Sequence, residues 1–287
     1  MAIQWYPGHM AKTKRLITEN LHLVDVVIEL LDARIPISSK NPDIDSIAGH
    51  KPKIVLLNKA DLANDNANAA WQAYFKERGV TAVLVNSTSG KGLAEITKSA
   101  EYLTGEKVRR EEAKGRRNVT IRAMIVGIPN VGKSTLINKY AGRDVAKAEN
   151  RPGVTKSKQW VKIKKNFELL DSPGILWHKF DDEATGIKLA CTGAIKDDIL
   201  DIYTLSLRLL EILVKNAPDE LAARYKIEII KGEHAEETLE RIAKARGFVK
   251  RGGVPDTDRA ATILIDEFRG AKIGKISLEY PADFTTV

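Results

Sequence analysis

An apolar run that leads into a glycine-bearing loop constrains the fold of this chain most strongly. Residues 124–134 read Met-Ile-Val-Gly-Ile-Pro-Asn-Val-Gly-Lys-Ser, and residues 133–141 continue with helical spacing. Between a strand and a helix, such a loop turns its backbone N–H groups inward around phosphate oxygens. Lys133 is expected to reach the outer phosphates, and the Ser134 hydroxyl to ligate Mg²⁺. We therefore expect nucleotide contacts from Asn130, Val131, Gly132, Lys133, Ser134 and Thr135.

A second motif, Asn58-Lys59-Ala60-Asp61, lies about seventy residues before the loop. The Asp61 carboxylate can accept hydrogen bonds from N1–H and the exocyclic amine of guanine, a pair that adenine lacks. Asn58 is expected to contact the other base edge, and Lys59 to lie along the ring. In residues 86–90, Asn-Ser-Thr-Ser-Gly, backbone N–H groups are expected near the guanine oxygen, with Ser87 favoured and Asn86 beside it. A conventional GTPase has the two motifs in the opposite order, so the sequence predicts a circularly permuted one that binds GTP or GDP.

Two further segments complete the predicted phosphate site. Asp171-Ser-Pro-Gly174 follows an apolar run, so Asp171 is expected to hold Mg²⁺ through water and Gly174 to offer its N–H to the terminal phosphate. In Arg151-Pro-Gly-Val-Thr155, Thr155 is placed to ligate Mg²⁺ only when the third phosphate is present. A plain proline-glycine turn is the alternative interpretation of that pentapeptide.

The residue that orients the attacking water is not the usual glutamine. Ile175 occupies that place and cannot hydrogen-bond water. In the unpermuted order, the helix after this turn would be residues 8–20, which brings His9 to the phosphate end of the site. His9 is therefore the catalytic candidate, acting by placement more than by base strength. His178 is its rival, and a contact of His9 with backbone or RNA is the alternative.

Asn130 suggests a second catalytic device. Its place in the loop fits a K⁺ site beside the β- and γ-phosphates, where the cation would supply the charge that an arginine finger provides elsewhere. A loop-stabilising hydrogen bond from Asn130 explains the residue equally well.

The remaining pattern predicts two domains. Short apolar runs alternate with helical segments up to about residue 180, as expected for a doubly wound, mostly parallel sheet. The runs lie at 24–31, 53–58, 81–86 and 120–126, the helices at 66–78, 92–103 and 133–141, and a hairpin at 159–170. Gly79 and Gly105 are expected to stop the first two helices, and residues 105–118 to form an exposed linker. Helices alone follow, over 197–215, after Pro218, and over 234–246 and 257–269. The predicted fold class is α/β: a circularly permuted P-loop GTPase domain over 1–180, then a smaller all-α domain over 181–287.

Composition and charge narrow the function. The net charge is +8, and the excess lies in residues 1–182, with 30 Lys and Arg against 20 Asp and Glu. It gathers in 107–117 and 143–165, which favours a salt-sensitive RNA contact next to the nucleotide site, although a solvated surface is the alternative. No long apolar segment or signal peptide is recognised, which predicts a cytoplasmic protein with no membrane contact. The single cysteine, Cys191, is expected in the core, and no Cys/His set predicts structural zinc.

The chain resembles the circularly permuted GTPases of ribosome assembly, and in particular the bacterial ribosome biogenesis GTPase A family. The resemblance rests on the motif order and on Trp5-Tyr-Pro-Gly-His-Met-Ala-Lys, Asp32-Ala-Arg-Ile-Pro, Pro129-Asn-Val-Gly-Lys-Ser and Lys250-Arg-Gly-Gly, and covers essentially the whole chain. It implies GTP-dependent maturation of the large ribosomal subunit, a role for His9 in hydrolysis, and rRNA contact through the helical domain. That domain is not basic overall, which leaves Lys244, Arg246, Lys250, Arg251 and Arg259 as its local RNA-binding candidates.

The predicted activity is hydrolysis of GTP, with low intrinsic turnover stimulated by the large subunit, by a monomer. Two alternatives remain at this point: a nucleotide-gated RNA-binding factor with incidental hydrolysis, and a GTPase of small-subunit maturation.

Overall fold

The computed structural model describes residues 15–145, 159–171 and 182–284. Its central sheet has the order β3-β2-β1-β4-β6-β5, and every neighbouring pair is parallel except β5 with β6. The strands are β1 Val26–Asp32, β2 Lys53–Asn58, β3 Thr81–Leu84, β4 Ile121–Gly127, β5 Gln159–Lys164 and β6 Phe167–Asp171. The predicted mostly parallel sheet, with a terminal hairpin, is confirmed.

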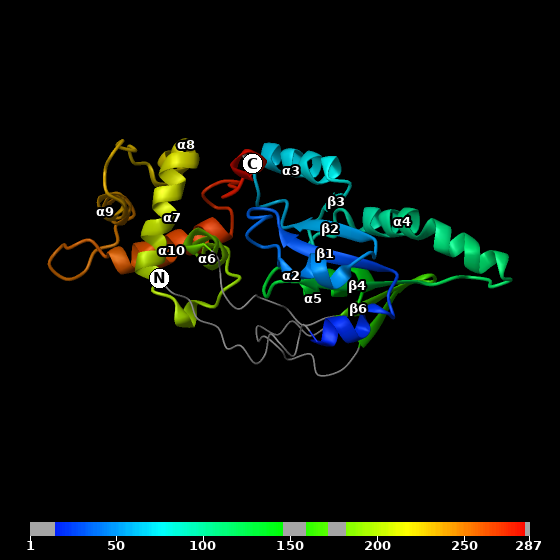
Figure 1. Ribbon diagram of the computed structural model, residues 1–287. Coiled ribbons are helices and arrows are strands. Elements are labelled where there is room, and N and C mark those ends of the chain that lie inside the picture. The colour runs from blue at the N-terminus through cyan, green and yellow to red at the C-terminus, as the bar shows by residue number, and fades with distance from the viewer. Residues whose placement is uncertain (1–14, 146–158, 172–181, 285–287) are drawn as a thin grey trace.

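Helices cover both faces of this sheet (Figure 1). One face packs against α4 (Leu93–Ala113) and α5 (Lys133–Ala141), and the other against residues 15–21, α2 (Asp43–Ala48) and α3 (Asp65–Glu77). Side chains in β1 alternate between the two faces, as a strand buried on both sides requires. Three layers result, and the carboxyl ends of the parallel strands meet at one edge.

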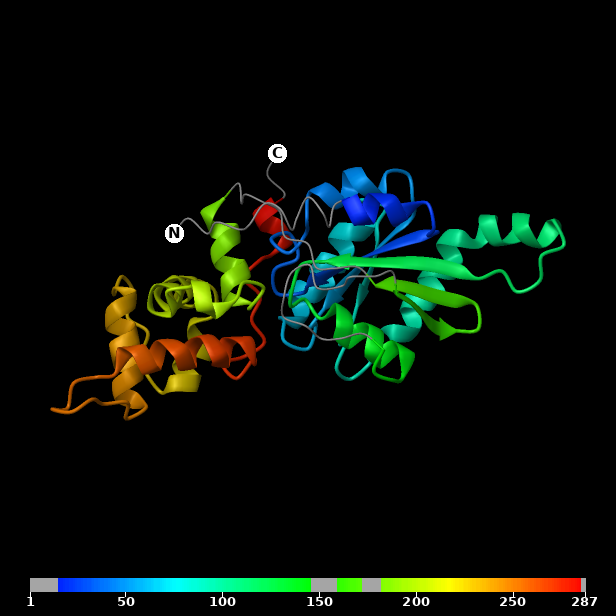
Figure 2. The ribbon, with the colours of Figure 1, turned by 90° about the horizontal axis from the view of Figure 1, so that it is seen from below.

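The predicted helix end at Gly105 is wrong, because α4 continues through Gly105 to Ala113. A glycine inside a helix costs only about 1 kcal/mol relative to alanine, and charged helix-forming residues follow it. The linker expected over 105–118 is therefore mainly helical. In Figures 1 and 2, α4 extends from the sheet to the end of the molecule that lies away from the helical part.

The helical part agrees with the prediction apart from one boundary and one additional helix, α6, for which no range was predicted. It contains α6 Glu183–Cys191, α7 Ile202–Asn216, α8 Pro218–Tyr225, α9 Ala235–Ala245 and α10 Thr257–Arg269, with short 3-10 turns at Asp197–Ile199 and Pro281–Phe284. The helix expected from residue 197 begins instead at Ile202, because the Asp201 side chain accepts from the Thr204 N–H and caps it there. None of the described helices is long and apolar enough to cross a membrane.

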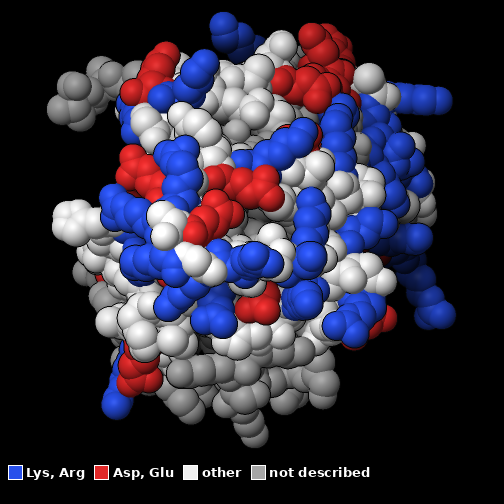
Figure 3. All heavy atoms as spheres, turned by 90° about the vertical axis from the view of Figure 1, so that its right-hand side faces the viewer, with Lys and Arg blue, Asp and Glu red and all other residues white. Residues whose placement is uncertain are grey.

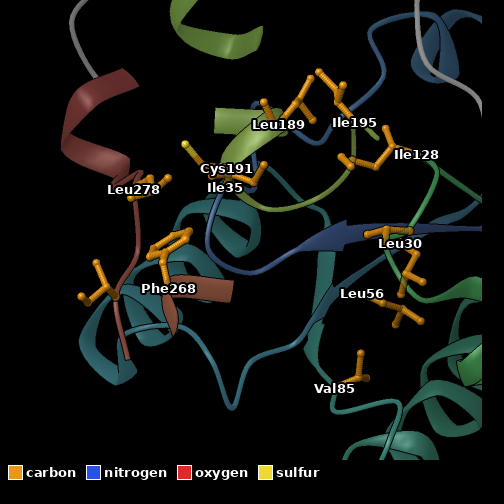
Figure 4. Close-up of a cluster of buried hydrophobic side chains, with 14 of the residues drawn as sticks. Leu30, Ile35, Leu56, Val85, Ile128, Leu189, Cys191, Ile195, Phe268 and Leu278 are labelled. Atoms are coloured by element: carbon orange, nitrogen blue, oxygen red, sulfur yellow. The ribbon is translucent and has the colours of Figure 1, made fainter. Parts of the chain in front are cut away.

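The apolar core continues from the sheet into the helical part. Figure 4 shows side chains of the α/β part gathered with side chains of α6, α10 and the C-terminal segment: Leu30, Ile35, Ile128, Leu189, Cys191, Ile195, Phe268 and Leu278. Cys191 is buried, as expected. Burial raises the pKa of its thiol to about 12, so it packs as a neutral core residue.

The C-terminal segment returns to the α/β part after α10. The Leu278 N–H donates to the Arg34 carbonyl oxygen over 2.9 Å, and the buried Glu279 carboxylate accepts from the backbone N–H groups of Ile37 and Ser38. Lys188 of α6 binds the same carboxylate over 3.1 Å. Residues at the end of the chain thus contact both parts. The boundary at 180/181 remains a prediction from sequence.

Candidate nucleotide-binding site

The predicted motifs meet at the carboxyl edge of the sheet. Asp32 and Asn58 are register partners at the ends of β1 and β2, and Leu30 pairs with Gly127 where β4 enters the phosphate loop. This is the edge at which open parallel sheets bind ligands. The reversed sequence order of the motifs therefore still gives one site.

The phosphate loop is folded around its lysine. The side chain of Lys133, at the start of α5, is buried and donates to the carbonyl oxygens of Gly127, over 3.0 Å, and Ile128, over 2.7 Å. Burial lowers the pKa of Lys133 to about 8, although the nearby Asp171 carboxylate acts in the opposite direction. A bound polyphosphate would replace these carbonyl contacts with charged ones.

Asn58 holds the base-reading and phosphate loops together. Its buried amide donates from Nδ2 to the Val131 carbonyl oxygen over 2.7 Å, and its Oδ1 accepts from Ser87 N–H and Oγ–H over 3.1 and 2.7 Å. The Ser87 N–H assigned to the guanine oxygen from sequence is therefore engaged by Asn58. The Asn86 side chain is also engaged, because its Oδ1 accepts from the backbone N–H groups of Thr88 and Ser89 and closes the turn that begins there. Their base contacts remain predictions.

Gly132 is required by this packing. Its φ is +103°, and a Cβ there would lie 2.5 Å from Asn58 Nδ2. Since Asn58 is buried and fixed by three hydrogen bonds, its side chain has little freedom to move aside.

Asp61 and Lys59 differ in their surroundings. Asp61 is exposed, as a carboxylate that reads a base must be. Lys59 has a left-handed backbone, with φ +58°, and its Nζ lies 3.0 Å from Asp32 Oδ2. The lysine of the base-reading motif is therefore held by a carboxylate from the neighbouring strand.

Asp32 also forms a buried ion pair with Arg34. The guanidinium donates to Oδ1 from Nε over 2.9 Å and to Oδ2 from Nη2 over 2.8 Å, and both side chains are at most 3% exposed. Burial alone would raise the pKa of Asp32, but Arg34 and Lys59 together hold that pKa well below its usual range. Sequence reasoning noted Asp32-Ala-Arg-Ile-Pro only as a family feature. The sequence did contain a signal for this ion pair, because an acidic and a basic residue stand close together at the end of a buried apolar run.

Arg34 continues this network into the helical part. Its remaining N–H groups approach the carbonyl oxygens of Thr192, after α6, and Arg269, at the end of α10, both over 3.4 Å. The guanidinium also lies 5.6 Å from the centre of the Phe268 ring, within reach of a cation–π contact.

Asn130 makes a second connection. Its Nδ2 donates to the carbonyl oxygen of Gly193 over 2.9 Å. This is a loop-stabilising hydrogen bond of the kind considered from sequence, but its acceptor belongs to the helical part. A K⁺ contact of Asn130 remains a prediction, which comparison of turnover in K⁺ and Na⁺ salts would test. The turn at 192–193 thus contacts both the phosphate loop and Arg34.

The donors described for a divalent cation fit Mg²⁺ in their chemistry. Ser134 offers a hydroxyl at the start of α5, and Asp171 a carboxylate at the end of β6, whose field reaches Lys133. Hard oxygen donors of this kind suit Mg²⁺. The predicted partners His9, Thr155, Gly174, Ile175 and His178 lie outside the described residues, so their placement remains a prediction.

The basic stretch 107–117 does not lie next to this site. α4 begins near the carboxyl edge of the sheet and runs back along it for about 30 Å, at 1.5 Å per residue. Lys107 forms an ion pair with Asp25, which directly precedes β1. The expected RNA contact beside the nucleotide is therefore wrong for this stretch, because the continuous helix carries it to the opposite edge.

The helical RNA candidates are largely engaged within the protein. Lys244 pairs with Glu240, Arg246 with Glu267, and Lys250 with Asp258. Arg259 stacks over Phe248 at 4.5 Å. Among the described residues, Arg251 has no ion-pair partner. The predicted local patch offers less free charge than its composition suggested.

Comparison with known proteins agrees with this geometry. A family model described as 50S ribosome-binding GTPase matches residues 122–232. Ribosome biogenesis GTPase A of Bacillus cereus is 50% identical over 284 residues, covering 99% of this chain and 96% of that protein. Two solved structures match 94% of this chain: GDP-bound TM YlqF, at 29% identity, TM-score 0.67 and 100% of its own length, and GNP-bound YlqF from T. maritima, at 30%, 0.66 and 98%.

Proposed function

The chain belongs to the ribosome biogenesis GTPase A family, hydrolyses GTP and acts in ribosome assembly. We propose that the particle on which it acts is the maturing large ribosomal subunit. In this proposal the protein binds ribosomal RNA and checks a late assembly step in the cytoplasm, as a monomer. Intrinsic turnover is low, and the subunit stimulates it. The supporting observation is the junction at 192–193, where Asn130 of the phosphate loop and Arg34, after β1, both donate hydrogen bonds to the helical part.

The proposed chemistry places each group by its role. Asp61 reads guanine, and Lys133 and the N–H groups of the loop bind phosphates. Ser134, Thr155 and, through water, Asp171 would hold Mg²⁺, which would supply positive charge beside the phosphates. Val131, Gly132, Thr135 and Gly174 complete the phosphate contacts. The helical part then responds to nucleotide through differential contacts, since a ligand shifts an equilibrium only by binding two states unequally.

Subunit-stimulated hydrolysis tests this function. We expect multiple-turnover GTP hydrolysis to rise at least about 10-fold with purified large subunits and to change little with small subunits, since stabilisation of the transition state by about 1.4 kcal/mol gives that factor. Stimulation by small subunits alone would instead indicate small-subunit maturation. RNA binding without stimulation would indicate a nucleotide-gated binding factor.

Replacing His9 by alanine tests the proposed water-positioning group. Hydrolysis is expected to fall about 10²-fold, while GTP affinity stays nearly unchanged, because the loss concerns the transition state alone. His178→Ala is the matched comparison and should retain most of the activity. Equal single-turnover rates for His9→Ala and the unmodified protein would rule out this role.

A further inference from the structure

The end of the α/β part that lies opposite the nucleotide site is strongly basic. It consists of the last turns of α4, the segment 114–122 and the β5–β6 turn, and we call it the basic end. Residues 105–122 and 162–168 contain ten Lys and Arg against four Glu. Figure 3 looks directly at this end and shows Lys and Arg side chains spread widely over it, with fewer Asp and Glu between them.

Five of these ten cations form ion pairs with neighbouring carboxylates. Ion pairs join Lys107 to Asp25, Arg110 to Glu106, Lys114 and Arg116 to Glu111, and Arg122 to Glu168. Within the part of the chain that the structure describes, the other five cations have no ion-pair partner and are exposed: Arg109, Arg117, Lys162, Lys164 and Lys165. Glu112 is exposed and has no ion-pair partner among the described residues, so the net charge of the unpaired groups remains positive.

The surface is concave where α4 meets the sheet. A hollow of about 910 Å³ lies between α4, the end of α2 and residues 21–25. Its lining includes the nitrogen-bearing side chains of His22, His50, Lys51, Lys107 and Arg110, together with the carboxylates of Asp25 and Glu106, which pair with Lys107 and Arg110. Lys51 also donates to the Val24 carbonyl oxygen, so three of these donors are already engaged. The exposed unpaired cations around the hollow are therefore the groups that can bind phosphate.

The apolar content of the basic end argues against a protein partner. The exposed large hydrophobic side chains of the described residues are Tyr102, Ile230, Val249 and Val254, and of these Tyr102 alone lies in the α/β part. A protein interface needs an apolar core, which one tyrosine does not provide. Tyr102 is 85% exposed and lies two helical turns before Arg109, on the same side of α4. An exposed ring beside unpaired cations suits base stacking next to a phosphate backbone.

We propose that the basic end binds the phosphate backbone of ribosomal RNA, as a second anchor separate from the nucleotide site and from the helical part. This rests on the proposed ribosomal function. With one anchor at each end of the molecule, the nucleotide site lies between two RNA contacts. A reorientation of the helical part would then change its RNA contacts while the α/β part stays bound to RNA.

A fourfold neutralisation tests the proposal. The variant Arg109→Gln/Arg117→Gln/Lys164→Gln/Lys165→Gln removes unpaired cations from the basic end. The control Lys76→Gln/Arg78→Gln/Lys98→Gln/Lys139→Gln removes the same charge from exposed sites of the α/β part outside the basic end. Each phosphate contact contributes roughly 0.7–0.9 to the slope of log affinity against log salt. We expect the first variant to bind purified large subunits at least about 10-fold more weakly near 0.1 M KCl, with the slope reduced by about three. Both variants should retain GDP affinity and hydrolysis without subunits, which verifies folding.

A 30-base-pair RNA duplex, measured in parallel, separates this proposal from the ribosomal one. The first variant should lose affinity and slope on the duplex as well. If the unmodified protein binds the duplex with that difference but binds no subunits, the ribosomal function fails while the basic end stands as an RNA site. Equal affinities and slopes for the two variants would overturn the basic end alone. Weaker subunit binding with an unchanged slope and unchanged duplex binding would assign the surface to a ribosomal protein and also overturn the proposal.

Discussion

Replacing Asp32 by alanine is expected to lower the free energy of unfolding by about 3–5 kcal/mol, the usual cost of leaving one member of a buried ion pair alone. Arg34 would then keep a buried guanidinium whose side chain is 1% exposed, with only long hydrogen bonds to Thr192 and Arg269. Urea unfolding measures the change. Glu19→Ala, which breaks the exposed pair with Arg15, is the matched control and should leave the free energy of unfolding nearly unchanged.

A double variant and a pH series separate charge from packing. Asp32→Ala/Arg34→Leu should recover part of the lost stability, because no unpaired buried charge remains. The pKa of Asp32 is depressed in the folded protein, so its contribution is fully present above its unfolded pKa of about 3.9 and is lost as pH falls through the lower folded value. The stability difference between Asp32→Ala and the unmodified protein should therefore stay constant from about pH 5 to 8 and shrink in stronger acid. A difference that changes between pH 5 and 8 would contradict this assignment.

The second large effect concerns nucleotide choice. Asp61→Asn should weaken GTP binding by about 10²–10⁴-fold, since two hydrogen bonds to a charged acceptor contribute about 1.5–3 kcal/mol each. An asparagine offers one acceptor and one donor, which complement N1–H and the C2 carbonyl of xanthine. Xanthosine triphosphate should therefore bind Asp61→Asn at least about 10-fold more tightly than it binds the unmodified protein.

Equilibrium binding of both nucleotides measures this exchange of specificity. Glu77→Gln makes the same carboxylate-to-amide change on an exposed site of α3 and should alter neither affinity. If Asp61→Asn kept full GTP affinity, the base-reading role of this motif would be wrong.

Local sequence signals predicted the fold well. The strand–loop–helix around Lys133, the helix stop at Gly79 and the proline in the first turn of α8 all depend on neighbours within a few residues. Gly105 misled because a single glycine can end a helix or be carried within one, and only the packing of α4 decides which. The same error misplaced the basic stretch 107–117, which was expected next to the nucleotide site and instead lies at the opposite edge of the sheet.

Contacts between residues far apart in the sequence could not be predicted from local patterns. Arg34 meets residues 192 and 269, and Asn130 meets Gly193, although each looked like a member of a local motif. Asn58, whose contact with the base remains a prediction, also joins two loops. These roles depend on which elements the permuted chain brings together.

One short turn, at residues 192–193, connects the nucleotide site to the helical part. Asn130 binds Gly193 from the phosphate loop, and Arg34 approaches Thr192 while its partner Asp32 holds Lys59 of the base-reading motif. The phosphate loop therefore contacts the turn after α6 directly, and the base-reading motif is linked to it through Asp32 and Arg34. A nucleotide that repositions either half would bias the helical part through these contacts.

Cosedimentation with separated ribosomal subunits tests the central claim most directly. The protein should bind large subunits at least about 10-fold more tightly with a non-hydrolysable GTP analogue than with GDP, and small subunits weakly in both states, since a switch requires differential affinity. Equal binding of large subunits in the two nucleotide states would contradict the account.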